Sequence, residues 1–218
     1  MRRASTAQKK EQRRASILEH ARTYIAARSF DEIRLSDLAR ELGLVKGTLY
    51  LYFPTKQDLF ASILVEEMEA WWAQCKEQRA TRSPGKDLAV GLGARMLLVR
   101  LIASLHMSIE PGLSPEGLRG MKSWFRDFAV RASKDLEDRY LGIAGRGLAL
   151  LIRIYALAVG AAQLAFPPGN VRTLIENDKS LSVFRIAFDA FLAESIDALY
   201  VGTRRLAGGN PRKRSASR

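Results

Sequence analysis

The sequence has few of the residues that build disulfide-linked or metal-dependent proteins. Among 218 residues there is one cysteine, Cys75, and there are two histidines, His20 and His106. A single cysteine excludes an internal disulfide framework and fits a reducing compartment, and we interpret Cys75 as an ordinary helix residue. With no Glu-x-x-His pair, no Gly-rich phosphate loop and no nucleophile–base pairing, we expect neither enzymatic activity nor a cofactor or metal.

Long apolar runs and strand patterns are also scarce. The longest apolar stretches, such as the one around 156–158, are interrupted by Arg, Gly and Gln before the roughly 20 residues that a membrane span needs. The N-terminus is basic and then polar, so we expect no secretory signal. Apolar residues recur at spacings of three and four almost everywhere. We therefore expect a cytoplasmic all-α protein with no membrane partner and with one or two domains.

Positive charge is in excess, and it is concentrated at the two ends of the chain. The net charge is +12. The first 14 residues hold six basic residues against one acidic residue, and residues 204–218 hold six against none, which leaves residues 15–203 nearly neutral. Basic arms suit contact with DNA phosphates, which supply much of the sequence-independent affinity of DNA-binding proteins. Tails that only aid solubility are the alternative, and for the C-terminal tail both interpretations stay open.

The spacing of apolar residues between Gly and Pro breaks predicts about nine helices. The ranges that the pattern defines are about 8–28, 35–42, 46–52, 56–82, 86–106, 115–140, 144–166 and 180–202. We expect three parts: a three-helix domain with a basic N-terminal arm over residues 1–55, a helical body over 56–203, and a basic, disordered tail over 204–218.

Residues 34–60 carry the most informative pattern, a helix-turn-helix. Two helices too short to be stable alone are joined by a turn that contains Gly43. Apolar residues are placed to lock these helices together: Leu38, Ala39, Leu42, Leu44, Leu49 and Phe53. The alternative is a small helical bundle in which the tyrosines of this segment merely pack. We disfavour it because the inward and outward residues separate cleanly.

The outward residues of the second short helix suit contact with DNA. They are Lys46, Gly47, Thr48, Tyr50 and Tyr52. Lys46 can donate to guanine O6 and N7 or to phosphate, and Thr48 can offer its hydroxyl to phosphate or its methyl group to thymine. Gly47 permits a close approach of the backbone, and Lys56 adds its charge to the free N–H groups at the start of the next helix. We therefore predict that this helix enters the major groove.

This segment resembles the DNA-binding domain of the tetracycline-repressor (TetR) family of bacterial regulators. The resemblance covers about residues 13–62 and rests on Leu38-Ala39, Leu42-Gly43, Lys46-Gly47-Thr48-Leu49-Tyr50, Tyr52-Phe53, Lys56 and Leu59-Phe60. It implies a homodimer on a near-palindromic DNA operator, with repression as the usual mode and release by a small-molecule effector. The residues that it places on DNA are Arg34, Ser36, Lys46, Gly47, Thr48, Tyr50, Tyr52 and Lys56.

Two positions depart from the family pattern. The family usually has a Ser or a similar residue at position 45 to cap the recognition helix, and this chain has Val45. Loss of the cap should cost about 1 kcal/mol of local stability, and it puts a hydroxyl contact with phosphate in doubt. Arg34 stands where the family often has a Thr that touches phosphate.

The body has no motif of comparable specificity, so its role is implied by the resemblance. In the family this part binds a ligand, and its last two long helices pair across the two-fold axis of the dimer. The sequence is compatible, because the helix at 144–166 is apolar nearly all round and must be covered on more than one side. We expect a homodimer through helices 144–166 and 180–202, and a monomeric core is the alternative.

Aromatic residues and methionines of the body, most of them before these two helices, are candidates for an effector pocket. The set, with one arginine, is Trp72, Met96, Arg100, Met107, Met121, Trp124, Phe128 and Tyr155. Such a lining suits an apolar or aromatic effector, although each residue also fits a plain core. Arg100 could hold an effector carboxylate or form a structural ion pair with a residue such as Glu110.

An alternative interpretation is that the chain is a non-specific or architectural DNA-binding protein without effector control. Such a protein would use its basic arms alone and would coat DNA broadly. Salt dependence does not separate the two functions, because both lose affinity as the salt concentration rises.

Overall fold

The computed structural model describes residues 2–28, 30, 32–140 and 142–208. Within these ranges the chain is helical and contains no strand, which confirms the predicted all-α class. The predicted basic tail lies outside the described residues from position 209 onward.

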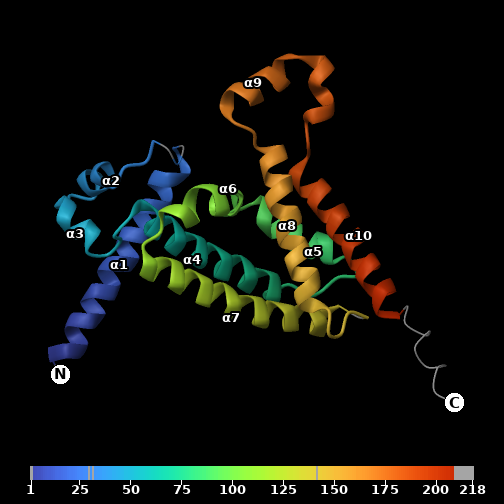
Figure 1. The fold of residues 1–218 in the computed structure, drawn as a ribbon, viewed down its shortest axis with the longest axis horizontal. Coiled ribbons are helices and arrows are strands. Elements are labelled where there is room, and N and C mark those ends of the chain that lie inside the picture. Colours follow the sequence, from blue (N-terminus) through green and yellow to red (C-terminus); the bar gives the residue numbers. More distant parts are fainter. Residues whose placement is uncertain (1, 29, 31, 141, 209–218) are drawn as a thin grey trace. The chain divides into compact units, whose positions relative to one another are not determined.

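Ten α-helices and three short helical segments follow one another along the described chain (Figure 1). Their bounds are α1 (Arg2–Ala26), α2 (Leu35–Glu41), α3 (Lys46–Tyr50), α4 (Lys56–Glu77), α5 (Pro84–Gly93), α6 (Met96–Ser104), η1 (Leu105–Ile109), η2 (Glu110–Gly112), α7 (Pro115–Arg139), α8 (Gly147–Ala165), α9 (Gly169–Asn177), η3 (Lys179–Phe184) and α10 (Phe188–Gly208).

The chain forms two compact units. The first combines Met1–Met68 with Ser104–Lys122, and the second combines Glu69–Ala103 with Ser123–Arg218. The first unit thus contains the predicted helix-turn-helix together with the turn before α7. The functional boundary predicted at residue 55 stays a prediction.

The long first helix is held in its unit by an apolar stripe and by ion pairs to α4. Ile17, Leu18, Ala21, Tyr24 and Ile25 recur at helical spacing and are all buried. On the neighbouring face of α1, the guanidinium of Arg22 pairs with the carboxylates of Glu66 and Glu67, 3.1 Å from the latter.

One carboxylate joins the N-terminal ends of α4 and α7 within the first unit. Asp58 accepts hydrogen bonds at Oδ2 from the backbone N–H and the hydroxyl of Thr55, at 3.0 and 2.9 Å. The Asp58 N–H donates back to Thr55 Oγ1 at 3.0 Å, which completes a capping box. Its Oδ1 accepts from the hydroxyl of Ser114, the residue before α7, at 2.9 Å. The starts of the two helices therefore share a buried anion.

In the second unit, α10 packs against both α5 and α8. Asp197 on α10 accepts a hydrogen bond from the Gly85 N–H at 2.8 Å and another from the Ser83 hydroxyl. A Cβ atom at Gly85 would lie 1.9 Å from the carbonyl oxygen of Ala193. Glycine is therefore needed at this contact, since any side chain would push the two helices apart.

Two predicted helices have different bounds in the structure. The helix expected at 86–106 is divided into α5 and α6, which meet at Ala94 and Arg95. Gly91 and Gly93 weaken helix propensity there, and Asp189 of α10 fills the space that a side chain at Gly93 would need. The helix expected at 180–202 begins only at Phe188, and the residues before it form α9 and η3.

The helix α8 is long and apolar enough to span a membrane by length and composition. This differs from the expectation that polar residues interrupt every such run, because Arg153 is the one charged residue within α8. A mostly buried core helix of a soluble protein passes the same test, whereas 28% of this stretch of α8 is buried within the described structure, including Leu150, Ile154 and Ala158.

Candidate nucleic-acid interface

The turn between α2 and α3 has the geometry that its sequence predicts. Gly43 adopts a left-handed conformation with φ of 62°, which a glycine reaches without steric cost. Its N–H donates to the Arg40 carbonyl at 3.1 Å, and the Leu44 N–H donates to the Ala39 carbonyl at 2.8 Å. These two hydrogen bonds form a Schellman motif, so α2 ends sharply and the chain turns into α3.

The seam between the two short helices is apolar and mostly buried. Leu38, Ala39, Leu49 and Phe53 are all buried, which confirms them as the lock between α2 and α3. The other two predicted seam residues, Leu42 and Leu44, are only half-buried.

Opposite this seam, α3 presents a small polar surface to solvent. Lys46, Gly47 and Tyr50 are exposed. The Lys46 ammonium lies 5.7 Å from the centre of the Tyr50 ring, within the range of a cation–π contact. Thr48 and Tyr52, which were predicted to face outward, are half-buried. We call Lys46, Gly47 and Tyr50 the reading face.

Gly47 leaves open space above the middle of α3. A Cβ atom built at this position would meet no atom within 4 Å outside its own helix backbone, and its φ is not in the left-handed region. The fold itself therefore does not require glycine here. A close approach of another molecule to the backbone at Gly47 would explain why a glycine is present.

Two apolar side chains, Val45 and Leu51, flank the reading face, and only Val45 was noted from the sequence. Val45 is the residue before α3, where it has extended φ and ψ of −65° and 134° and offers no side-chain cap, as predicted. Leu51 follows the last residue of α3. Each is 78% exposed. Apolar groups beside a recognition helix can contact the methyl groups of thymine.

The predicted backbone-contact residues lie in different settings. Arg34, at the start of α2, is exposed, and Ser36 is half-buried. The ammonium of Lys56 lies 3.2 Å from the carbonyl oxygen of Phe30 and 3.4 Å from that of Ile33. Lys56 thus ties the start of α4 to the chain between α1 and α2. Among the described residues, these two acceptors leave one of its three N–H groups for another acceptor.

The basic N-terminal segment is helical, because α1 begins at Arg2 and not near residue 8 as predicted. Lys9, Lys10 and Arg13 are exposed. The guanidinium of Arg14, the next residue, lies 5.4 Å from the centre of the Phe53 ring and donates to the Ser62 hydroxyl at 2.9 Å. Arg14 therefore fixes this part of α1 beside the end of the helix-turn-helix.

Three of the predicted pocket residues form one aromatic cluster in the second unit. The ring of Phe128 is stacked on Trp124 at 5.0 Å and lies 5.7 Å from Trp72 in an edge-on arrangement. Both indole N–H groups donate to carboxylates, from Trp72 to Asp135 at 2.8 Å and from Trp124 to Glu69 at 2.9 Å.

The other predicted pocket residues are dispersed. Met107 and Met121 belong to the first unit, where Met121 is buried and Met107 is 80% exposed. In the second unit Met96 is exposed, and Arg100 and Tyr155 are half-buried. Burial lowers the pKa of Arg100 from its ordinary value. The eight residues therefore do not all belong to one compact unit.

An ion pair between Arg100 and Glu110 was one of the two interpretations of Arg100. In the structure, the ion pairs of Glu110 are formed with Lys122 and His106. Glu110 pairs with the ammonium of Lys122, and its other oxygen lies 3.2 Å from Nδ1 of His106. Burial raises the pKa of Glu110, but the hydrogen bonds from Lys122 and His106 outweigh burial and leave this pKa below its ordinary value.

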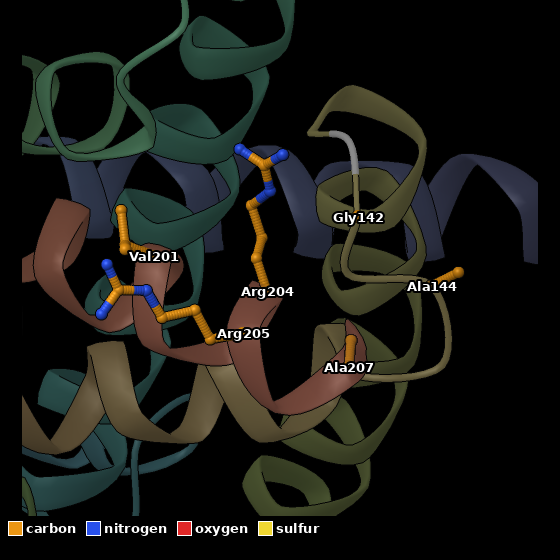
Figure 2. Close-up of a pocket in the computed structure, with 6 residues that line it drawn as sticks. All are labelled: Gly142, Ala144, Val201, Arg204, Arg205 and Ala207. Atoms are coloured by element: carbon orange, nitrogen blue, oxygen red, sulfur yellow. The ribbon is translucent and has the colours of Figure 1, made fainter. Parts of the chain in front are cut away.

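A cavity of about 680 Å³ lies between the C-terminal end of α10 and the loop after α7. Its lining residues are Gly142, Ala144, Val201, Arg204, Arg205 and Ala207, none of which was predicted for the effector pocket. Figure 2 shows that the side chains of Arg204 and Arg205 point in different directions. Their guanidinium groups do not converge on one ligand position.

Comparisons with known proteins agree with the helix-turn-helix and extend beyond it. Residues 17–63 match the family model described as bacterial regulatory proteins, tetR family. Residues 61–205, most of the chain, match the model described as tetracyclin repressor-like, C-terminal domain.

Individual relatives are distant and match over short segments. The fatty acid metabolism regulator protein of Bacillus subtilis (strain 168) is 26% identical over 96 residues, 44% of each chain. The HTH-type transcriptional regulator EthR of Mycolicibacterium smegmatis is 35% identical over 54 residues, 25% of each chain. The matched segments thus span less than half the length of these relatives.

A solved structure supports the fold over nearly the whole chain. The crystal structure of a possible TetR family transcriptional regulator from Streptomyces coelicolor A3(2) has a TM-score of 0.59 and 22% sequence identity. The match covers 88% of this chain and 99% of that one. Members of the TetR family bind DNA, dimerise and act mostly as repressors, and their C-terminal domains bind ligands. The two family models that match residues 17–205 show that this chain belongs to the TetR family of DNA-binding transcriptional regulators.

Proposed function

We propose that this protein acts in the cytoplasm as a homodimeric repressor that leaves a near-palindromic operator when its body binds a small molecule. In this proposal residues 1–55 read DNA and residues 56–203 pair the subunits and bind the effector. The observation that carries the proposal is the reading face. Lys46, Gly47 and Tyr50 are exposed, while four of the six residues of the seam, Leu38, Ala39, Leu49 and Phe53, are buried.

The DNA contacts divide into base-proximal and backbone contacts. Lys46, Gly47, Thr48 and Tyr50 lie on the helix that would enter the major groove. We assign the contacts outside this base-proximal set to Arg34, Ser36, Tyr52 and Lys56. The exposed Lys9, Lys10 and Arg13 of α1 supply a sequence-independent attraction to DNA phosphates, since the rest of the three-helix domain is nearly neutral.

The dimer forms through α8 and α10. Within the second unit, these two helices keep several large apolar side chains exposed: Leu148, Ile152, Leu164, Phe191, Val201 and Leu206. Pairing with a second copy would remove them from water, and exposed apolar patches of this kind mark interaction sites. A dimer also places two reading faces on one DNA, about 34 Å or one helical turn apart.

The effector is an apolar or aromatic small molecule. The cluster of Trp72, Trp124 and Phe128 supplies an aromatic surface, and the other pocket candidates are Met96, Arg100, Met107, Met121 and Tyr155. One relative is named a fatty acid metabolism regulator, so fatty acids belong among the compounds to be tested. An effector that prefers one conformation of the body must weaken DNA binding by the same factor as DNA weakens effector binding.

Selection of bound sequences from random DNA, followed by footprinting, tests the proposal. A regulator should enrich one short palindrome and protect a few sites, each covering two half-sites. Broad protection without an enriched palindrome would favour the architectural alternative. Titration of the operator complex with fatty acids and aromatic acids tests effector control. An operator affinity that no compound changes would overturn that part of the proposal.

A further inference from the structure

A segment between α8 and α10 stands apart from the helices of its unit. Residues 167–187, which we call the α9 arm, include α9 and η3. Figure 1 shows the arm as the orange loop beyond the ends of α8 and α10, all of which belong to the second unit. Not one residue of the arm is buried.

Its own hydrogen bonds give the arm a defined shape. At its base, the ring of Phe166 lies 5.3 Å from that of Phe188, which closes the loop where it leaves α8 and enters α10. The guanidinium of Arg185 donates to the carbonyl oxygens of Ile175 and Glu176, each at 2.9 Å, and so binds the end of α9. The Asp178 carboxylate accepts from the Ser180 N–H at 2.8 Å and caps η3.

Several apolar side chains of the arm are exposed to solvent. Leu174 is 59% exposed, Val183 78% and Phe184 58%. Contiguous exposed apolar groups on a soluble protein mark a surface that another molecule covers. The charged residues of the arm nearly cancel, with Arg172, Lys179 and Arg185 against Glu176 and Asp178. The arm therefore lacks the excess of basic residues that DNA phosphates attract.

We propose that the α9 arm packs against a second copy of this chain. The arm connects the two helices whose exposed apolar residues form the proposed dimer face. Leu164, near its start, and Phe191, just after its end, belong to that face and are exposed. The arm thus follows exposed apolar residues of the proposed dimer face at one end and precedes them at the other, and pairing of two chains would cover both. This inference rests on the proposed homodimer.

Thiol labelling tests the proposal directly, because the native Cys75 is buried and burial raises its pKa to about 11. Val183→Cys places a reactive thiol on the arm. Val130→Cys is the matched control, because Val130 is 63% exposed on α7 and lies outside both the arm and the proposed dimer face. With a maleimide, Val183→Cys in the dimer should react at least tenfold more slowly than Val130→Cys. In the monomer, obtained by dilution or with Ile152→Glu, the two rates should agree within about twofold. Equal rates in the dimer, or protection that persists in the monomer, would overturn the proposal.

A second pair of variants measures the contribution of the arm to pairing. Val183→Ser/Phe184→Ser should raise the dimer dissociation constant at least tenfold in sedimentation equilibrium, with an unchanged helical circular dichroism signal. The control Leu118→Ser/Val130→Ser removes exposed apolar groups of α7, outside the arm, and should leave the constant within about twofold. If Ile152→Glu separates the subunits but the arm variant does not, the arm proposal is wrong and the dimer face stands. If neither variant does, both are wrong.

Discussion

Ser114 donates its hydroxyl to Asp58 Oδ1 at 2.9 Å and its N–H to the same oxygen at 3.3 Å. Asp58 lies in the first turn of α4, directly after the helix-turn-helix, and Ser114 precedes α7. Both α4 and α7 continue into the second unit. The Asp58–Ser114 pair is therefore the point within the first unit where the two helices that lead toward the body are joined.

Replacing Asp58 should destabilise the fold through this junction. In Asp58→Asn an amide N–H₂ group must face donors from Thr55 or Ser114, so we expect a loss of about 2 kcal/mol in the free energy of unfolding. Ser114→Ala removes one cap and should cost about 1 kcal/mol. Urea denaturation measures both. The control Asp127→Asn, at an exposed position on α7, should stay within about 0.5 kcal/mol of the native protein. A loss in Asp58→Asn no larger than in this control would contradict the assignment.

Gly47→Ala should separate stability from DNA binding. The added methyl group meets nothing in the protein, and alanine favours a helix over glycine by up to about 1 kcal/mol. Thermal stability should therefore be unchanged or higher. Operator affinity should fall at least tenfold, because the methyl group stands between the backbone and the DNA.

Gly120→Ala is the matched control for this prediction. Gly120 lies within α7, and a Cβ atom there also meets nothing within 4 Å. Thermal melts and mobility-shift titrations of the two variants should show similar stability and different operator affinity. Equal operator affinity in both would show that DNA does not approach the backbone at Gly47.

Val45→Ser should restore the missing cap of α3. Serine at this position can accept a hydrogen bond from an N–H group of the first helical turn, and such caps contribute about 1 kcal/mol. Val45 is highly exposed, so its removal should cost little apolar burial. We expect a higher urea midpoint for Val45→Ser than for Val45→Ala. Equal midpoints would mean that the turn geometry prevents capping.

Local patterns predicted the helix-turn-helix well, because its seam depends on residues close together in sequence. The spacing of Leu38, Ala39 and Leu49 and the left-handed Gly43 need no distant partner to be recognised. The break between α5 and α6 was missed, because Asp189 of α10 occupies the space beside Gly93. Such a contact depends on tertiary packing and leaves no local signal.

The surroundings of the candidate pocket residues depend on tertiary packing in the same way. Trp72, Trp124 and Phe128 were predicted as candidates for an effector pocket, and the structure places them in one aromatic cluster. The two indole N–H groups of this cluster bind carboxylates that the sequence does not mark. Met107 lies within an apolar run, yet it is exposed because η1 turns it outward. The exposure of the α9 arm was not predicted either, since a helical pattern does not tell whether a neighbour covers it.

Alkaline pH should destabilise the fold through Cys75. Burial raises the pKa of this thiol from 9.0 to about 11, so the folded state holds the proton more tightly than the unfolded chain does. The resulting stabilisation is complete below pH 9 and declines as the pH rises from 9 to 11. The pKa of Tyr140 is raised as well, by burial and by its hydrogen bond to Asp87, and it acts in the same direction.

The thiol contribution can be isolated with Cys75→Ala. Between pH 8 and pH 10.5 the native protein should lose about 1–2 kcal/mol more unfolding free energy than the variant loses. Urea denaturation at the two pH values gives this difference, and the constant cost of the mutation cancels. An identical loss in both proteins would show that the thiol ionises as freely in the folded protein as in the unfolded chain.

Operator binding by the double variant Lys46→Ala/Tyr50→Ala, compared with that of Lys86→Ala/Val130→Ala at exposed positions in the body, tests most directly whether α3 reads DNA. Mobility-shift titrations would use the selected palindrome and a scrambled DNA of equal length at one salt concentration. We expect the reading-face variant to lose at least a hundredfold of its preference for the palindrome, while its affinity for scrambled DNA falls less than tenfold. The body variant should keep its preference. Undiminished preference for the palindrome in Lys46→Ala/Tyr50→Ala would contradict the assignment of α3 as the helix that reads DNA.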